Sequence, residues 1–234
     1  MIEQIPSGIP GLDEMLRGGF PKGRTILVIG GPGSGKTIFG VQFLIKGAYE
    51  FGENGIFLSF DERKEHLYSE MEAFGWRLSE AESERKLAFV DAYPRRVKGD
   101  RRLFFEKPLS TLRQELERIS AKRIVVDPIT SLILQYPNAV NRRNAVVNLI
   151  DTLNDLGLTS VITLELRSSG FDRSVQLEEY LANGVIVLQT VQVGKSLVKT
   201  LHVEKMRGID HDDQPRPYRI TEKGIKVYAK ETIF

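Results

Sequence analysis

The chain has 234 residues, of which 41% are hydrophobic and 27% are charged, with a formal net charge of +2. This balance is that of a globular protein with a sizeable core, and the small net charge gives no overall electrostatic case for nucleic-acid binding. The absence of cysteine excludes disulfides, thiolate metal sites and cysteine nucleophiles. No apolar run approaches the roughly 18 residues of a membrane span, and the first residues lack a signal-peptide core, so we expect a cytoplasmic protein without a membrane segment.

From residue 25 onward, short apolar runs alternate with stretches of helical periodicity. Runs rich in β-branched residues predict buried parallel strands, and the amphipathic stretches between them predict helices. The predicted strands cover residues 25–30, 55–60, 86–92, 123–128 and 159–165. The predicted helices cover residues 37–52, 64–76, 109–120 and 142–157. Ser110 or Thr111 is the expected N-cap of the third helix.

Near the C-terminal end, hairpin signals replace this alternation. Two β runs within residues 184–206 meet near Gly194, and two more within residues 218–229 meet at the turn 222–224. No internal repeat or linker is visible. The chain therefore predicts one domain over residues 1–234, an α/β fold whose mostly parallel central sheet has helices on both faces and antiparallel strands at its C-terminal end.

The segment GGPGSGKT, residues 30–37, has the spacing of a phosphate-binding P-loop and lies between a predicted strand and a predicted helix. Glycines let backbone N–H groups curl around phosphate oxygens, and the helix N-terminus adds partial positive charge. Lys36 can reach the β- and γ-phosphates, and the hydroxyl of Thr37 can ligate Mg²⁺. The alternative is a glycine-rich turn with an unrelated lysine, but the spacing and the flanking elements favour the P-loop.

Acidic residues follow two of the predicted strands. Asp127 ends the fourth apolar run, where a Walker B aspartate would orient Mg²⁺. Asp61 and Glu62 follow the second run, at the carboxyl edge where open α/β sheets bind ligands. Such a pair can orient or deprotonate water, but acids also occur at helix N-termini because they suit the helix dipole. The spacing alone leaves both interpretations of Asp61 and Glu62 open.

Together these segments resemble the KaiC-like ATPases of the RecA superfamily, in a single-domain form like the archaeal members. The resemblance runs nearly end to end and rests on a glycine-rich N-terminal signature, the P-loop, the acid pair, the Walker B strand, the strand after it, and a late Lys-x-Arg-Gly segment. These are residues 5–23, 30–37, 60–67, 123–132, 160–165 and 204–211. The late segment makes the resemblance specific to the family, because a P-loop alone occurs throughout the superfamily.

The resemblance implies a RecA-like P-loop NTPase core that binds ATP and Mg²⁺ between the subunits of a homo-oligomer, a hexameric ring in this family. Lys36, Asp61 and Glu62 would be catalytic, and Thr37 and Asp127 would hold the metal. Both acids are usually Glu in the family, and Asp is one methylene shorter, so Glu62 is preferred and Asp61 remains a candidate. The nucleotide-binding residues carried over from the P-loop are Gly31, Pro32, Gly33, Ser34, Gly35, Lys36, Thr37 and Ile38.

The resemblance also assigns residues near the C-terminal end. Lys205 and Arg207 would contact the phosphates bound by a neighbouring subunit, acting in trans. Around them, the residues expected to line that same site are Met206, Ile209 and His211. Thr221 and Glu222 would lie near the base or ribose. The alternative for Lys205 and Arg207 is a solvated strand face, and for His211 it is a surface loop.

A basic segment is compatible with a different function, the binding of nucleic acid. Residues 93–105 combine five cations with aromatic residues, a composition that can track a nucleic-acid backbone and stack bases. The cations are Arg95, Arg96, Lys98, Arg101 and Arg102. Three hypotheses therefore stand: an oligomeric ATPase acting as a regulatory or partner-remodelling switch, an ATP-gated DNA-binding recombination or repair factor, and a nucleotide sensor without turnover. The acid pair and the late cations favour turnover, and nucleic acid is not favoured.

Overall fold

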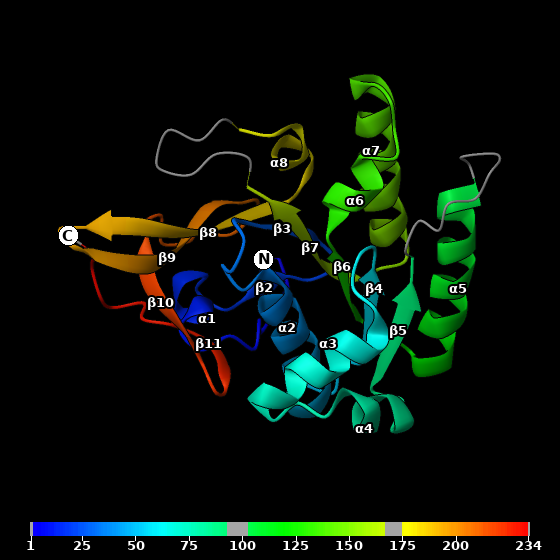
Figure 1. The fold of residues 1–234 in the computed structure, drawn as a ribbon, viewed down its shortest axis with the longest axis horizontal. Coiled ribbons are helices and arrows are strands. Elements are labelled where there is room, and N and C mark those ends of the chain that lie inside the picture. The colour runs from blue at the N-terminus through cyan, green and yellow to red at the C-terminus, as the bar shows by residue number, and fades with distance from the viewer. Residues whose placement is uncertain (1, 93–102, 167–174, 234) are drawn as a thin grey trace.

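The computed structural model describes residues 2–92, 103–166 and 175–233. Its centre is a nine-stranded sheet with the order β11-β10-β9-β8-β3-β7-β6-β4-β5 (Figure 1). Six neighbouring strands run parallel, and the remaining three are antiparallel additions at one edge. The α/β fold with a mostly parallel sheet, helices on both faces and C-terminal antiparallel strands is thus confirmed.

The parallel strands are the apolar runs of the sequence. They are β3 (Thr25–Gly30), β4 (Gly55–Ser59), β5 (Leu87–Asp91), β6 (Arg123–Asp127), β7 (Thr159–Glu165) and β8 (Gly184–Val193). Alternate side chains enter two separate cores: Val28 packs on one face of the sheet, and Leu27 and Ile29 pack on the other. Because both faces are covered, the strands are mostly apolar, which is why apolar runs identified β3 to β7.

Helices cover both faces of this sheet (Figure 1). On one face lie α2 (Lys36–Glu50), α3 (Lys64–Met71) with a 3₁₀ turn (Glu72–Phe74), and α4 (Leu78–Ser83). On the other lie α5 (Leu103–Ile119), α6 (Ile129–Ile133), α7 (Ala139–Asp155) and α8 (Leu177–Leu181). No helix in the described ranges combines the length and apolar character needed to cross a membrane.

The cap expected for the third predicted helix was wrong. Helix α5 begins at Leu103 and runs through Pro108, so Ser110 and Thr111 lie inside it. The helix tolerates Pro108 although a proline lacks the N–H of one intrahelical hydrogen bond. Leu112 is fully buried in the core that α5 forms with β4 and β5, and this packing outweighs the local preference for a start at Ser110.

The two ends of the chain meet on the face that carries α2. A small N-terminal unit consists of β1 (Gln4–Ile5), α1 (Leu12–Met15) and β2 (Phe20–Pro21). The C-terminal strands are β9 (Ser196–Met206), β10 (Arg216–Thr221) and β11 (Gly224–Val227), and both predicted hairpins are confirmed. Gln42 of α2 ties the ends together, since its amide donates to the carbonyls of Gly8 and Ile225 at 3.1 and 3.0 Å.

A buried ion pair supports the sheet at the edge where the parallel strands begin. Arg123 is fully buried, and its Nε lies 2.7 Å from a carboxylate oxygen of Glu53. Its guanidinium also lies over the rings of Phe43 and Phe51, 4.6 and 5.5 Å from their centroids. A buried cation of this kind depends on its counter-ion, because an unpaired charge is costly away from water.

We expect Glu53→Gln to lower the free energy of unfolding by about 3 kcal/mol, because the guanidinium stays buried without its counter-charge. Denaturant unfolding measures the change. Glu50→Gln is the matched control, since Glu50 pairs with Lys46 on the exposed surface of α2, where such pairs contribute at most about 0.5 kcal/mol. Equal effects of the two substitutions would contradict the role given to Arg123.

Candidate nucleotide-binding site

The P-loop connects β3 to α2 as the sequence predicted. Gly33 and Gly35 have φ of 70° and 90°, a left-handed region that favours glycine, and α2 begins at Lys36. The Lys36 ammonium donates to the carbonyls of Gly30 and Gly31 at 2.9 and 3.1 Å, so it lies over the loop. Burial lowers the pKa of Lys36, and the charges of Asp127 and Glu165 offset part of that effect.

A cavity of about 380 Å³ adjoins this loop. Its floor is the P-loop and the start of α2, and its walls come from α3, the following 3₁₀ turn and β10. The residues that line it are Gly33, Gly35, Lys36, Thr37, Ile38, Glu70, Met71, Phe74 and Ile220. Apolar side chains next to a phosphate loop suit a flat base. Thr221 and Glu222 directly follow Ile220, so the turn assigned to the base or ribose lies beside the P-loop of the same chain.

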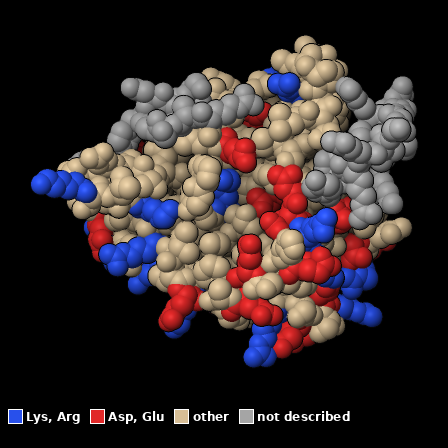
Figure 2. Space-filling view, viewed as in Figure 1, with Lys and Arg blue, Asp and Glu red and all other residues tan. Residues whose placement is uncertain are grey.

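Charge is unevenly distributed around this cavity. In Figure 2, acidic side chains gather over α3 and α4, whereas lysines and arginines gather over the C-terminal strands. The cavity has Glu70 of α3 on one side and Ile220 of β10 on the other, so it lies at the boundary of the two regions.

Asp127 is held beside the first turn of α2. Its side chain is 5% exposed and accepts hydrogen bonds from the hydroxyls of Thr37, at 2.8 Å, and Thr163. Burial raises the pKa of Asp127, while both hydroxyls and the charge of Lys36 oppose the rise. A hydroxyl and a carboxylate side by side fit Mg²⁺, which takes oxygen ligands and retains waters and phosphate oxygens as the others.

The acid pair lies at the same edge of the sheet. Ser59 is opposite Asp127 in the register of β4 and β6, so Asp61 and Glu62 emerge next to the Walker B position. The Ser59 hydroxyl fixes this turn, because it donates to the Glu62 carbonyl at 2.7 Å and accepts from the Glu62 N–H at 2.9 Å. The charge of Asp61 adds to the raised pKa of Asp127. The carboxylate of Glu62 lies 3.5 Å from Nδ1 of His66.

Several residues at this edge were not predicted from the sequence. Glu165 ends β7, which lies between β3 and β6, and therefore stands between the P-loop and Asp127. Thr163 binds Asp127, and His66 lies beside Glu62. A hydroxyl residue between two apolar neighbours, Ile162 and Leu164, was the available signal for Thr163. For Glu165 the signal was its place at the end of a strand, like Asp127.

A β-bulge in β9 changes the face of the sheet on which the late basic residues, Lys205 and Arg207, lie. In the β8–β9 ladder, Val185 lies opposite Lys205 and Ile186 opposite Val203, so β9 carries one extra residue at Glu204. Val203 and Met206 are consequently buried on the face of α2. Lys205 and Arg207 point to the face of α8, where they donate to the carbonyls of Glu179 and Tyr180 at 2.6 and 3.1 Å. Burial lowers the pKa of Lys205, and the charge of Arg207 lowers it further.

These two cations lie far from the P-loop of their own chain. The Arg207 N–H donates to Asn183, whose N–H donates to the Thr25 carbonyl at the first residue of β3. The P-loop begins at the other end of that strand, roughly 16 Å away for five residues of extended chain. Next in the chain, Ile209 packs partly buried against the core, and His211 lies in a half-exposed loop on the N-terminal unit.

The sheet, the P-loop and the buried aspartate define a P-loop nucleotide-binding protein with a RecA-type core, and comparisons with known proteins agree. A family model for the ATPase KaiC matches residues 5–232. A UPF0273 protein of Thermotoga maritima is 33% identical over 99% of this chain and 98% of its own length. The clock oscillator protein KaiC of Synechococcus elongatus is 32% identical over 97% of this chain, but only 44% of that protein is covered.

Among solved structures, a KaiC-like protein of Pyrococcus horikoshii has a TM-score of 0.85 and 36% identity, covering 97% of this chain and 100% of that one. The chain therefore belongs to the KaiC-like ATPase family. The five cations of the basic segment, Arg95 to Arg102, lie outside the described residues.

The tight turn at Gly35 provides a test of the site. A Cβ there would lie 2.9 Å from Cδ1 of Ile220, in a backbone with φ of 90°. We expect Gly35→Ala to weaken nucleotide binding more than about tenfold, because alanine is strained at φ of 90° and the Ile220 side chain beside the cavity must also move. Isothermal titration with ADP measures this change.

Gly52→Ala is the control, because Gly52 has φ of 68° but open space where a Cβ would lie. It should cost about 1 kcal/mol of stability through backbone strain alone and leave ADP affinity unchanged. Unaltered ADP binding by Gly35→Ala would contradict the site geometry.

Proposed function

We propose that this protein is a Mg²⁺-dependent ATP hydrolase that acts as an oligomeric regulatory or partner-remodelling switch, a hexameric ring in which ATP binds between subunits. The observation that carries the proposal is the separation within one chain. The P-loop lies at the carboxyl edge of the sheet, whereas Lys205 and Arg207 lie at the opposite edge, held by carbonyls of α8. This separation supports the assignment of both cations to the phosphates bound by another copy.

In this proposal each element of the nucleotide site has one task. The P-loop backbone and Lys36 bind the β- and γ-phosphates, and the cavity beside Ile38, Phe74 and Ile220 takes the base. Thr37 and Asp127 hold Mg²⁺, which would neutralise charge on the phosphate oxygens. Their direct hydrogen bond supports this assignment, because it brings the hydroxyl and the carboxylate within 2.8 Å of each other.

Glu62 is the proposed water-activating residue. Its side chain is longer than that of Asp61 and extends from a turn that Ser59 fixes. Asp61 interacts electrostatically with Asp127, so we place it on the metal side of the site. The charge that develops on the γ-phosphoryl oxygens would be stabilised by Lys205 and Arg207 of the neighbour. Turnover would then depend on assembly, which distinguishes a switch from a non-hydrolysing nucleotide sensor.

Substitutions of Lys36 and Glu62 test whether the first residue is needed for ATP binding and the second for hydrolysis. Lys36→Ala should abolish detectable ATP binding, because the cation over the phosphate loop is removed. Glu62→Gln should bind ATP as wild type does but lower kcat by about 100-fold or more, as expected for loss of a general base. Titration calorimetry and a phosphate-release assay measure the two effects.

Asp61→Asn is the matched control for Glu62→Gln. It should retain more turnover and should mainly raise the Mg²⁺ concentration needed for half-maximal activity. A larger loss of kcat in Asp61→Asn than in Glu62→Gln would transfer the catalytic role to Asp61. Wild-type turnover in Glu62→Gln would remove its assigned role.

A mixing experiment tests action in trans. Lys36→Ala lacks phosphate binding but supplies intact late cations, and the double variant Lys205→Ala/Arg207→Ala has the reverse defect. Each should be inactive alone. Mixed before assembly, they should recover activity above the sum of the two, since some interfaces pair an intact P-loop with intact cations. Absence of recovery in mixed oligomers that light scattering shows to be fully assembled would contradict trans action.

A further inference from the structure

Two side chains of the C-terminal strands hold the P-loop from outside. The Lys199 ammonium on β9 donates to the Gly33 carbonyl at 2.8 Å, and the Tyr218 hydroxyl on β10 donates to the Ser34 carbonyl at 2.6 Å. These donors lie 166 and 184 residues further along the chain than their acceptors. Neither belongs to the P-loop motif.

Holding these carbonyls fixes the direction of the neighbouring N–H groups. The C=O and the N–H of one trans peptide unit point in opposite directions. When Gly33 and Ser34 direct their carbonyls toward β9 and β10, the N–H groups of Ser34 and Gly35 point away from those strands, and that of Ser34 donates to the Gly31 carbonyl within the loop at 3.3 Å. A P-loop binds phosphate through such N–H groups, so their orientation sets its affinity.

We propose that Lys199 and Tyr218 are positioning residues that hold the P-loop in its phosphate-binding conformation, and that Lys199 is the adjustable member of the pair. This role rests on the proposed function in one respect only, because it requires that the P-loop binds a nucleotide. It requires neither hydrolysis nor a particular oligomer.

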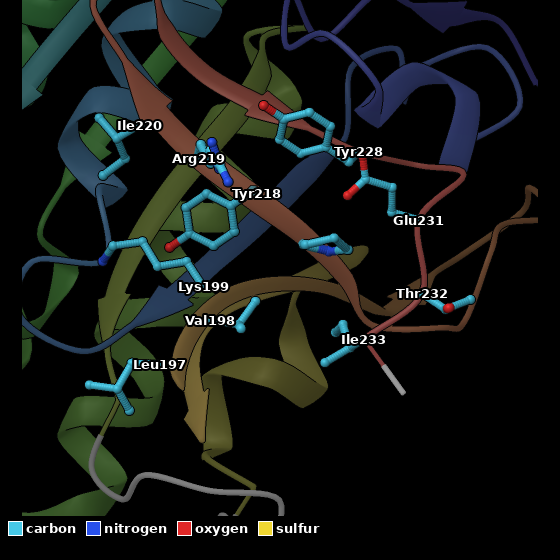
Figure 3. A pocket seen from close by; sticks show the side chains of 11 residues that line it. Leu197, Val198, Lys199, Tyr218, Arg219, Ile220, Tyr228, Glu231, Thr232 and Ile233 are labelled. Atoms are coloured by element: carbon cyan, nitrogen blue, oxygen red, sulfur yellow. The ribbon is translucent and has the colours of Figure 1, made fainter. Parts of the chain in front are cut away.

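The surroundings of the two donors differ in a way that separates their roles. The side chain of Tyr218 is 2% exposed and packs in the core, so its hydroxyl has a fixed position. Lys199 is half-buried and lines a cavity of about 800 Å³ (Figure 3). Tyr218 lines the same cavity, but its ring is rigid and packed in the core, whereas the flexible stem of Lys199 has room to carry the ammonium away from Gly33.

The cavity exists because two strands diverge. β10 pairs with β9 only at Arg216 opposite Leu201 and Pro217 opposite Thr200. Beyond this point β10 stays with β11, whereas β9 continues along β8. Lys199 lies two residues from Leu201 and directly beside the last paired residue, at the opening of the wedge. From this position on β9 the Lys199 ammonium reaches the Gly33 carbonyl of the P-loop.

Substitutions at Lys199 test the positioning role through ADP affinity. Lys199→Met removes the donor but keeps a long stem, and should raise the Kd for ADP roughly threefold to tenfold, as expected for one lost hydrogen bond. Lys199→Arg keeps a donor and should restore binding. Tyr218→Phe should weaken binding at least as much as Lys199→Met, because it leaves the buried Ser34 carbonyl without its donor.

The matched control is Lys195→Met, which removes the same charge from the β8–β9 hairpin at its exposed turn. It should leave ADP affinity unchanged. The melting temperature of each nucleotide-free variant separates positioning from stability: Lys199→Met should melt like wild type and still bind ADP more weakly. Wild-type ADP affinity in Lys199→Met would overturn the proposal, as would an equal loss in Lys195→Met.

These measurements distinguish failure of the positioning role from failure of the proposed function. They are made with ADP in the Lys205→Ala/Arg207→Ala background, where no late cations can contribute. If the Lys205→Ala/Arg207→Ala protein binds ADP and the added Lys199→Met leaves its affinity unchanged, only the positioning role fails. If wild type itself does not bind ADP, or Lys36→Ala binds it unchanged, the proposed function fails.

Discussion

The hydrogen bonds of the buried Asp127 carboxylate are the interaction on which the rest of this structure depends. They join Thr37 in the first turn of α2 to Thr163 on β7, while the backbone of Asp127 pairs with β4. A buried carboxylate destabilises a fold unless donors satisfy it, so these partners must be present together. Three strands and one helix therefore keep a fixed relation at the edge where the nucleotide loop lies.

This fixed relation explains why the site is formed by strand ends rather than by one long loop. In the order β3-β7-β6-β4, the strand ends present Gly30, Glu165, Asp127 and Ser59 in sequence across the edge. Each strand contributes one or two residues, and the sheet register aligns them. A shift in the pairing of β6 would move Asp127 away from both Thr37 and the acid pair.

Much of this could be predicted from the sequence because the signals were local. Buried strands are continuous apolar runs, the P-loop has fixed spacing, and Asp127 ends its strand. The contacts of Lys199, Tyr218 and Thr163 could not be predicted in this way, since they depend on strand order and on where β9 and β10 diverge. Periodicity contains no information on either. The start of α5 was misplaced for a related reason, because packing against β4 and β5 overrides the local signal at Ser110.

The bulge at Glu204 has a consequence for how the length of β9 can vary. In a regular strand, odd and even positions occupy opposite faces, so residues 201, 203, 205 and 207 would all share one side. The single extra residue reverses this parity after Val203, which sends Met206 inward and both cations outward. Removing Glu204 would leave a regular ladder that keeps Met206 on the face of α2 and both cations on the face of α8, whereas a regular strand that retained Glu204 would exchange the two faces and bury the charges. The number of backbone residues in β9 therefore sets the face on which Lys205 and Arg207 both lie, whatever side chains stand at these positions.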